Sequence, residues 1–224
     1  MIAIEGMQFK DPVELHNKHI GEHCIIIGGG ETIRDWQKSG LNVAKMIQCN
    51  ATFGINRSYR LGVSTYHTCM DWSYWSSEKD QLSKLDTVFM LPQSVCVNGK
   101  LTNAYMLRNC GIVEDIIPHN FNNGINYGKS SGYIAMVCAY LMGYNPIYLL
   151  GFDLVGHHFH EGYGKDRDMR INSDHRIIYS SMVRGIKELQ KRNISIISLS
   201  LLSRLNQFIE YDDHILQPYI QKTA

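Results

Sequence analysis

The stretch 126–153 constrains the fold of this 224-residue chain more than any other part of the sequence. A polar loop that ends in Ser130-Ser131-Gly132 leads into an apolar segment of helical length, 133–142. A strand of buried composition, 147–151, follows and leads to Asp153. In an α/β domain this order puts a helix N-terminus and the carboxyl end of a strand near one edge of the sheet, where such folds bind ligands. We therefore expect the active site at that edge. Asp153 is either a ligand contact there, which we favour, or a capping acid that holds the next loop.

The composition fits one folded domain and argues against several classes of protein. A hydrophobic fraction of 44% argues for a packed core, and a net charge of +1 gives no overall basic field for nucleic acid. The six cysteines contain no CxxC pair, which favours buried thiols in a reducing compartment over a disulfide framework. No apolar run has the ~20 residues that span a membrane, and the charged N-terminus is unlike a signal peptide. We expect a cytoplasmic protein, in the host cytoplasm if the chain is viral.

Alternating strands and helices predict one α/β domain over residues 1–224, with a single Rossmann-like, mostly parallel sheet flanked by helices. The predicted strands are 24–27, 45–48, 52–55, 65–70, 87–91, 95–101, 112–117, 147–151 and 194–199. The predicted helices are 12–19, 31–36, 133–142, 175–190 and 201–211. The sequence shows no internal repeat and no linker that would divide it.

A glycine loop follows the first predicted strand of this sheet. The strand 24–27 runs into Gly28-Gly29-Gly30, and a predicted helix follows at once. Backbone N–H groups at such a junction can hold a phosphate. The full GxGxxG pattern is absent because Ile33 occupies the last glycine position, so the loop indicates a nucleotide-like cradle and not a dinucleotide site. An ordinary strand-to-helix turn is the alternative.

Short polar residues follow two further predicted strands. Asn56 comes after 52–55, and Asp71 comes after 65–70. Side chains of this kind at the carboxyl ends of parallel strands are placed to contact a base or a ribose. We therefore expect Asn56 and Asp71 to lie beside the glycine loop.

Residues 155–174 are glycine-rich, charged and aromatic, without a clear period, and predict a mobile lid over the site. Within them, Asp166-Arg167-Asp168 matches the DxD pattern by which many glycosyltransferases hold a divalent cation, and nearby histidines add further metal-ligand types. The DxD lies late in the chain and not after an early strand. We therefore favour a solvated charged loop and predict no metal site.

Four stretches of the sequence together resemble a known family. They are 25–35, 53–59, 130–153 and 197–210. They are similar to the bacterial lipooligosaccharide sialyltransferases and to the related hydroxymethylpterin-diphosphokinase-like proteins, many of them encoded by phages. The resemblance covers roughly residues 23–210, and the Ser-Ser-Gly helix with its following strand and acid is its most specific part. The sequence departs from the family where Glu31-Thr32-Ile33 replaces Pro-Ser-Leu after the glycine loop.

The resemblance implies a cytidine monophosphate sugar as donor and assigns residues to it. Gly28, Gly30 and Thr32 are implied near the donor phosphate, and Asn56 near the nucleotide. The implied donor contacts at the helix N-terminus are Ser130, Ser131 and Gly132.

The family's general base is a histidine before the penultimate helix, and His175 matches it by position. A neutral histidine at a helix start suits this role, because the positive end of the helix dipole favours the neutral ring. The family also places two lid tyrosines on the leaving phosphate. The first position holds Val155 here, and Tyr163 is an approximate match to the second.

The predicted function is transfer of a sugar from a nucleotide donor to an acceptor hydroxyl, on a glycan or another molecule, without a required cofactor. We also expect a homo-oligomer, as in many family members. Three alternatives stay open. The first is a pterin-alcohol diphosphokinase that uses ATP and Mg²⁺. This chemistry needs carboxylates around the glycine loop, and Glu31 and Asp71 are the candidates for them. The second is a non-catalytic nucleotide-binding member, and the third is glycosylation of a modified phage DNA base.

Overall fold

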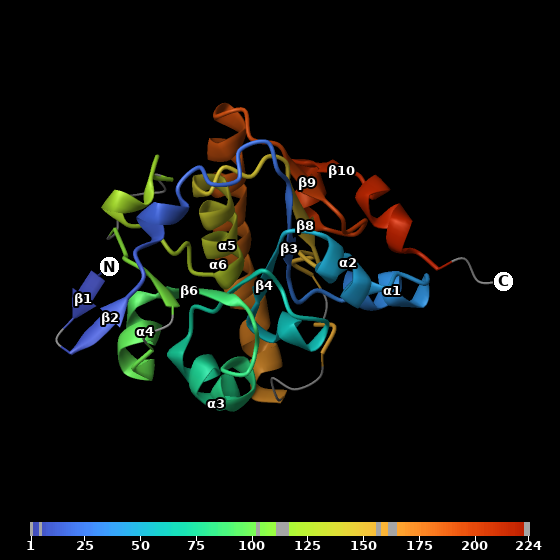
Figure 1. Ribbon diagram of the computed structural model, residues 1–224. Helices are drawn as coiled ribbons and strands as arrows, with labels where there is room; N and C mark the ends of the chain where they lie inside the picture. Colours follow the sequence, from blue (N-terminus) through green and yellow to red (C-terminus); the bar gives the residue numbers. More distant parts are fainter. Residues whose placement is uncertain are drawn as a thin grey trace.

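The fold is a three-layer α/β/α arrangement around one parallel sheet (Figure 1). The structure, a computed structural model, describes residues 2–4, 6–101, 104–110, 117–155, 158–160 and 165–221, with 2–4 and 165–175 described by their backbone alone. The strands are β3 (Cys24–Ile27), β4 (Thr52–Ile55), β5 (Tyr66–Thr68), β6 (Val88–Pro92), β7 (Ala104–Leu107), β8 (Ile147–Leu150), β9 (Ile196–Ser198) and β10 (Glu210–Tyr211). A short antiparallel hairpin, β1 (Ile2–Ile4) and β2 (Met7–Phe9), precedes them.

The strand order β10-β9-β8-β3-β4-β5-β6-β7 explains where a ligand can bind. The chain moves outward from β3 through β4 to β7, then returns to β8 on the other side of β3. Ile27 at the end of β3 pairs with Gly54 of β4 and with Leu150 of β8. Because the order reverses between β3 and β8, a crevice opens beyond their carboxyl ends, which is where doubly wound sheets bind ligands.

Alternating side chains of β3 point to the two faces of the sheet. Cys24 and Ile26 pack into the cluster that contains α5 (Ser131–Leu141) and α6 (Lys165–Lys191). Ile25 and Ile27 pack into the cluster under α1 (Thr32–Lys38) and α2 (Val43–Cys49). A strand buried on both faces reads as a continuous apolar run, which is why CIII is so hydrophobic.

Further along the sheet, α3 (Trp72–Leu82) and α4 (Gln93–Gly99) cover β5 to β7 together with the N-terminal hairpin. Helices α5 and α6 lie side by side against the centre of the sheet (Figure 1). Helix α5 is buried nearly all round, because the sheet covers one side and α6 the other. None of the described helices is both long and apolar enough to cross a membrane.

The observed sheet confirms the predicted fold class, and most predicted strands appear within two or three residues of their expected ends. Two predicted strands are wrong. Residues 45–48 belong to α2, which Asn42 caps by accepting a hydrogen bond from the Lys45 N–H at 3.0 Å. Residues 95–99 belong to α4, and the Asn98-Gly99 pair ends that helix and does not turn a hairpin. Each helix has seven residues, and in so short a segment apolar spacing does not separate a helix from a strand.

Three predicted helices also differ from the observed elements. The first, 12–19, is a 3-10 helix over Pro12–Leu15 only. Helix α6 begins at Lys165, ten residues before the predicted start, so the part of the predicted lid at 165–174 is helical. No glycine or proline stands between Lys165 and Gly185, so the sequence holds nothing that ends a helix there. The predicted helix 201–211 is instead a short 3-10 turn, Arg204–Gln207, followed by β10. The predicted strand 112–117 lies almost wholly outside the described residues, and β7 was not predicted.

Candidate functional site

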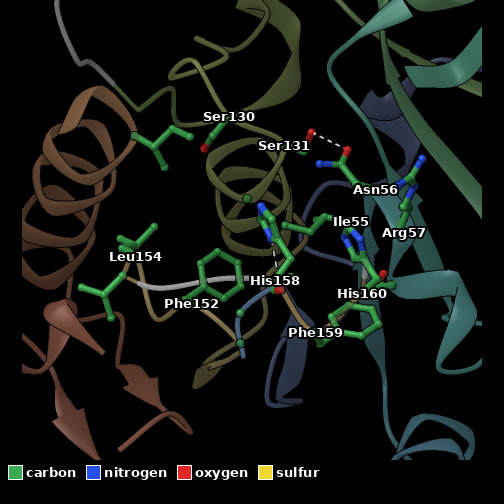
Figure 2. Close-up of a pocket in the computed structure, with 18 residues that line it drawn as sticks. Ile55, Asn56, Arg57, Ser130, Ser131, Phe152, Leu154, His158, Phe159 and His160 are labelled. Carbon is green, nitrogen blue, oxygen red and sulfur yellow. Dashed lines mark hydrogen bonds between the residues drawn. The ribbon is translucent and has the colours of Figure 1, made fainter. Parts of the chain in front are cut away.

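A cavity of about 140 Å³ opens at the carboxyl edge of the sheet, beside the ends of β3, β4 and β8 (Figure 2). Its lining residues are 28–30, 55–58, 130–132, 151–152, 154–155, 158–160 and Ile178. Sites that enclose a drug-sized ligand usually have roughly 300–1,000 Å³. In the observed conformation the cavity therefore encloses only part of a molecule as large as a nucleotide sugar.

The start of α5 forms one wall of the cavity. The Ser130 side chain accepts a hydrogen bond from the Tyr133 N–H at 3.0 Å and so caps the helix. The next hydroxyl, on Ser131, donates to Asn56 Oδ1 at 3.1 Å and accepts from the Met70 N–H at 2.9 Å. These bonds tie the helix N-terminus to the ends of β4 and β5.

Asn56 sits in a backbone conformation that few residues adopt. Its φ of 48° is left-handed, a region where asparagine is favoured over most other side chains. Behind Asn56 lies His67, whose pKa is lowered to about 4 because the ring is buried. The neighbouring Asn56 backbone raises this pKa, but by less than burial lowers it. His67 therefore stays neutral at neutral pH, buried next to the Asn56 backbone.

Arg57 adds a cation to the cavity lining, next to Asn56. Its Nε and Nη2 atoms lie 2.9 and 2.8 Å from Glu78 Oε1 on α3. The other Glu78 oxygen accepts a hydrogen bond from the Tyr59 hydroxyl and lies 3.5 Å from Arg60. Burial alone raises the pKa of Glu78, but Tyr59 and the two arginines outweigh it and lower the pKa. Two cations around one ionised carboxylate leave a net positive charge at this wall.

The N-terminus of α1, by contrast, is closed by a carboxylate of the protein itself. Asp153 Oδ2 accepts a hydrogen bond from the Thr32 N–H at 2.8 Å, and the side chain is 4% exposed. Gly30 permits this approach, because a Cβ there would lie 2.5 Å from Oδ2. The carboxylate occupies the place where a phosphate would sit at this helix start.

In the glycine loop, one carbonyl oxygen accepts hydrogen bonds from segment 158–160, and two N–H groups donate to carbonyl groups at the end of β8. The Gly28 and Gly30 N–H groups donate to Leu150 O and Gly151 O at 2.7 and 2.8 Å. Gly29 O accepts from the Phe159 N–H at 2.8 Å and lies 3.1 Å from His158 Nδ1. The loop therefore holds β8 and the segment 158–160.

Three contacts fasten segment 158–160 over the loop. His158 forms an antiparallel bridge with Gly30, and Phe159 is buried in the core cluster beneath α1. Arg34 Nε donates to Phe159 O at 2.6 Å. The rings of His158 and His160 stack with their centroids 5.2 Å apart and their planes 6° apart. Figure 2 shows the His158 ring between Phe152 and Ile55, extending toward the start of α5.

The structure brings together six of the residues predicted for the site. They are Gly28, Gly30, Asn56, Ser130, Ser131 and Gly132.

Three other predicted residues do not line this cavity. Asp153 turns toward α1, and Thr32 is buried beside Trp36 and Leu201 on another side of that helix. Asp71 is exposed at the start of α3. In this structure the three side chains lie outside the cavity lining, because Thr32 and Asp71 stand at the starts of α1 and α3 and Asp153 binds the first turn of α1.

Two predicted residues fall where the structure gives no side chain. Tyr163 lies outside the described residues, and His175 is described only by its backbone. His175 stands ten residues after Lys165, the first residue of α6, so the predicted position at a helix start is wrong and the dipole argument for its neutral ring does not apply. The DxD segment, 166–168, is likewise described only as helix. Their predicted roles stay predictions. Among the described residues, one group has metal-ligand spacing, Asp212, Asp213 and His214; it is partly exposed and does not line the cavity.

The cavity-lining residues that were not predicted for the site include the cation Arg57 and the rings of Phe152, His158 and His160. Phe152 directly precedes the predicted Asp153, but β8 ends at Leu150 and Gly151 has a φ of 71°, so strand alternation does not decide which of the two faces the cavity. Arg57 directly follows the predicted Asn56. No sequence signal places His158 against the glycine loop, because that contact joins segments 129 residues apart.

No protein-family model matches this sequence, and no curated protein does. Solved structures do match. The chain is similar to the sialyltransferase CstII from Campylobacter jejuni in complex with the substrate analogue CMP-3FNeuAc, with a TM-score of 0.57, 17% identity and 91% of each chain covered. It is also similar to the monofunctional α-2,3-sialyltransferase Cst-I from the same organism, with a TM-score of 0.55, 14% identity, and 100% of this chain and 86% of that chain covered.

A third similar structure is CstII in complex with a trisaccharide acceptor and CMP, with a TM-score of 0.55, 16% identity and 91% of each chain covered. At these identities the likeness shows the fold alone. The chain therefore has a sialyltransferase-like α/β fold. The predicted likeness to the diphosphokinase-like proteins gains no support from these structures.

Proposed function

We propose that this protein is a glycosyltransferase that moves a sugar from a cytidine-monophosphate donor to an acceptor hydroxyl. One observation carries the proposal: the start of α5, Asn56 and the glycine loop line one cavity at the switch point of the sheet. Solved structures with a similar fold contain CMP or CMP-3FNeuAc.

The α5 side of the cavity suits the nucleotide phosphate. A helix N-terminus carries partial positive charge, and α5 has eleven residues. Arg57 and Arg60 around the single Glu78 carboxylate leave a net positive charge nearby. Ser131 and Asn56 supply short polar groups for the ribose or the base.

The reaction needs three things from the protein. The acceptor hydroxyl must pass its proton to a base as it attacks the anomeric carbon. The bond from that carbon to the phosphate oxygen breaks, and the leaving phosphate gains charge that donors must stabilise. Water must be kept from the donor. His175 as base and Tyr163 on the phosphate remain the sequence-based proposals for two of these roles.

Ligand-dependent thermal stability tests the donor class. Wild-type protein is heated with CMP, CDP, UDP, GDP, a pterin, or ATP with Mg²⁺. We expect CMP to raise Tm most, because a ligand that binds the native state alone stabilises it by mass action. Asn56→Ala should abolish most of the CMP shift, and Asp71→Ala, outside the cavity, should keep it.

A shift with ATP and Mg²⁺ and none with CMP would replace this proposal with the diphosphokinase. No shift with any of these ligands would contradict nucleotide binding itself, and with it both the transferase and the non-catalytic nucleotide-binding member. If CMP binds, release of CMP from CMP-sialic acid, with and without glycan acceptors, tests turnover. Glycosylated DNA as product would identify a modified base as the acceptor instead.

A further inference from the structure

We propose that His158 is the group that takes the proton from the attacking hydroxyl at this site. The inference rests on the proposed function and names the base within it. It differs from the sequence-based assignment of that role to His175.

The position of His158 supports the assignment. Its ring stands in the middle of the cavity lining, between Phe152 and Ile55, and extends toward Ser131 and the start of α5 (Figure 2). The proposed phosphate position, the start of α5, lies on the side toward which this ring extends, so a bound donor and the ring share one cavity. A general base must reach the proton within hydrogen-bond distance, so location is the first requirement.

The hydrogen bond behind the ring sets its tautomer. His158 Nδ1 lies 3.1 Å from Gly29 O, and a carbonyl oxygen only accepts hydrogen bonds. Nδ1 must therefore carry the proton in the neutral ring. Nε2, on the opposite side of the ring, is then the nitrogen that accepts a proton.

The backbone on both sides of this contact is fixed. The Phe159 N–H donates to the same carbonyl, Gly29 O, at 2.8 Å, and the Phe159 ring is buried beneath α1. Arg34 binds the Phe159 carbonyl at 2.6 Å. The His160 ring stacks on His158 with nearly parallel planes. A base held this way loses little orientation when substrate binds, which is what efficient proton transfer needs.

The step balances without a further reactant. The acceptor oxygen forms a bond to the anomeric carbon while its proton moves to His158 Nε2. The bond from the anomeric carbon to the phosphate oxygen breaks, and its electron pair leaves with CMP. The imidazolium returns its proton to solvent after the products leave.

Four variants test the proposal in the whole protein: His158→Gln, Gly29→Ala, His175→Gln and the distant control His214→Gln. The affinity for CMP is measured by calorimetry, and the rate of CMP release from CMP-sialic acid is measured at saturation. We expect His158→Gln to slow release by about 100-fold or more with CMP affinity within about threefold of wild type. His214→Gln should match wild type.

Gly29→Ala displaces the base without removing it. A Cβ at this position would lie 2.7 Å from His158 Nδ1. We therefore expect slower CMP release in a protein that still contains His158. A ¹⁵N spectrum of wild-type imidazoles should show the Nδ1–H tautomer for the resonance that His158→Gln removes.

The outcomes separate the proposals. CMP release unchanged in His158→Gln, with a large loss in His175→Gln, overturns the role of His158 and leaves the proposed function standing. Tighter CMP binding with unchanged release in His158→Gln shows that the ring only blocks the cavity, and it also overturns the role. Wild type that neither binds CMP nor releases it from CMP-sialic acid overturns the proposed function and this inference with it.

Discussion

Two helices begin at the same edge of the sheet, and their N-termini are used differently. At α1, which follows the glycine loop, the Asp153 carboxylate already binds the Thr32 N–H of the first turn. At α5 the capping group is the small hydroxyl of Ser130, and the next residue, Ser131, faces the cavity. A glycine loop before a helix therefore does not by itself make a phosphate site. A neighbouring strand can deliver a carboxylate that fills it.

Lowering the pH should make the largest change in the free energy of unfolding. It acts near the start of α5 through His67, the buried histidine next to Asn56. The folded-state pKa of His67 is lowered from 6.5 to about 4, so the unfolded chain binds the proton first. The free energy of unfolding is therefore highest above pH 6.5. It falls by about 3 kcal/mol as the pH is lowered toward 4, because protonation of this ring favours the unfolded chain. Urea unfolding of wild type and His67→Gln across this range measures it. Equal pH slopes in the two proteins would rule this histidine out as the source.

Asp153→Ala should be next in size and should separate the two helices. It leaves the Thr32 N–H buried without its acceptor, so we expect a loss of about 2 kcal/mol in the free energy of unfolding. CMP affinity should stay within about twofold, since Asp153 does not line the cavity. Asp153→Asn keeps an acceptor and should lose less stability. A tenfold loss of CMP affinity at unchanged stability would instead place the carboxylate on the ligand.

Ser131→Ala should lower the affinity for CMP, which Asp153→Ala leaves nearly unchanged. It removes the acceptor for the Met70 N–H and the donor to Asn56 Oδ1, which frees Asn56 to leave its ligand-facing position. We expect CMP affinity to fall about tenfold, the size of one lost hydrogen-bond interaction. Calorimetric titration with CMP measures it, and Asp153→Asn is the matched control. Unchanged affinity would mean that the Ser131–Asn56 pair only joins α5 to the sheet.

Ser130→Ala should have the smallest effect of these variants on stability. It separates the capping role of Ser130 from the proposed ligand-binding role of Ser131. Loss of this cap costs about 1 kcal/mol of stability, because the Tyr133 N–H loses its partner. Ser130→Asn retains a capping oxygen and should restore most of that stability. Ser130→Asp also caps but adds a negative charge beside the proposed phosphate position, so CMP should bind it more weakly than the asparagine variant. Equal CMP affinities for the two variants would place the phosphate elsewhere.

The fold was predictable where patterns are long or unambiguous. The β-branched runs of β3 and β8 stand out because strands buried on both faces need them, and Asn145-Pro146 together with Gly143 marks the end of α5. Helices α2 and α4 were misread because seven residues carry too little periodicity. The early start of α6 was missed because charged residues suggested a loop where no helix-breaking residue stands.

The location of the site was predictable, but the orientation of some of its side chains was not. The glycine loop, Asn56 and Ser130-Ser131-Gly132 meet because parallel strands share one carboxyl edge. Asp153 was placed in the site because the sequence shows that it follows β8 but not which way it turns. His158 depends on a pairing with Gly29 and Gly30 that only the folded chain creates.

The hydrogen bond from the Phe159 N–H to Gly29 O has a practical consequence. Whether this amide proton is protected from solvent depends on whether segment 158–160 stays on the glycine loop. That proton exchanges with solvent only when the bond opens, and the exchange is slow while Phe159 stays packed beneath α1. Deuterium uptake at this single amide therefore reports, in unlabelled and unmodified protein, whether a ligand enters beside His158 or displaces the segment that carries it.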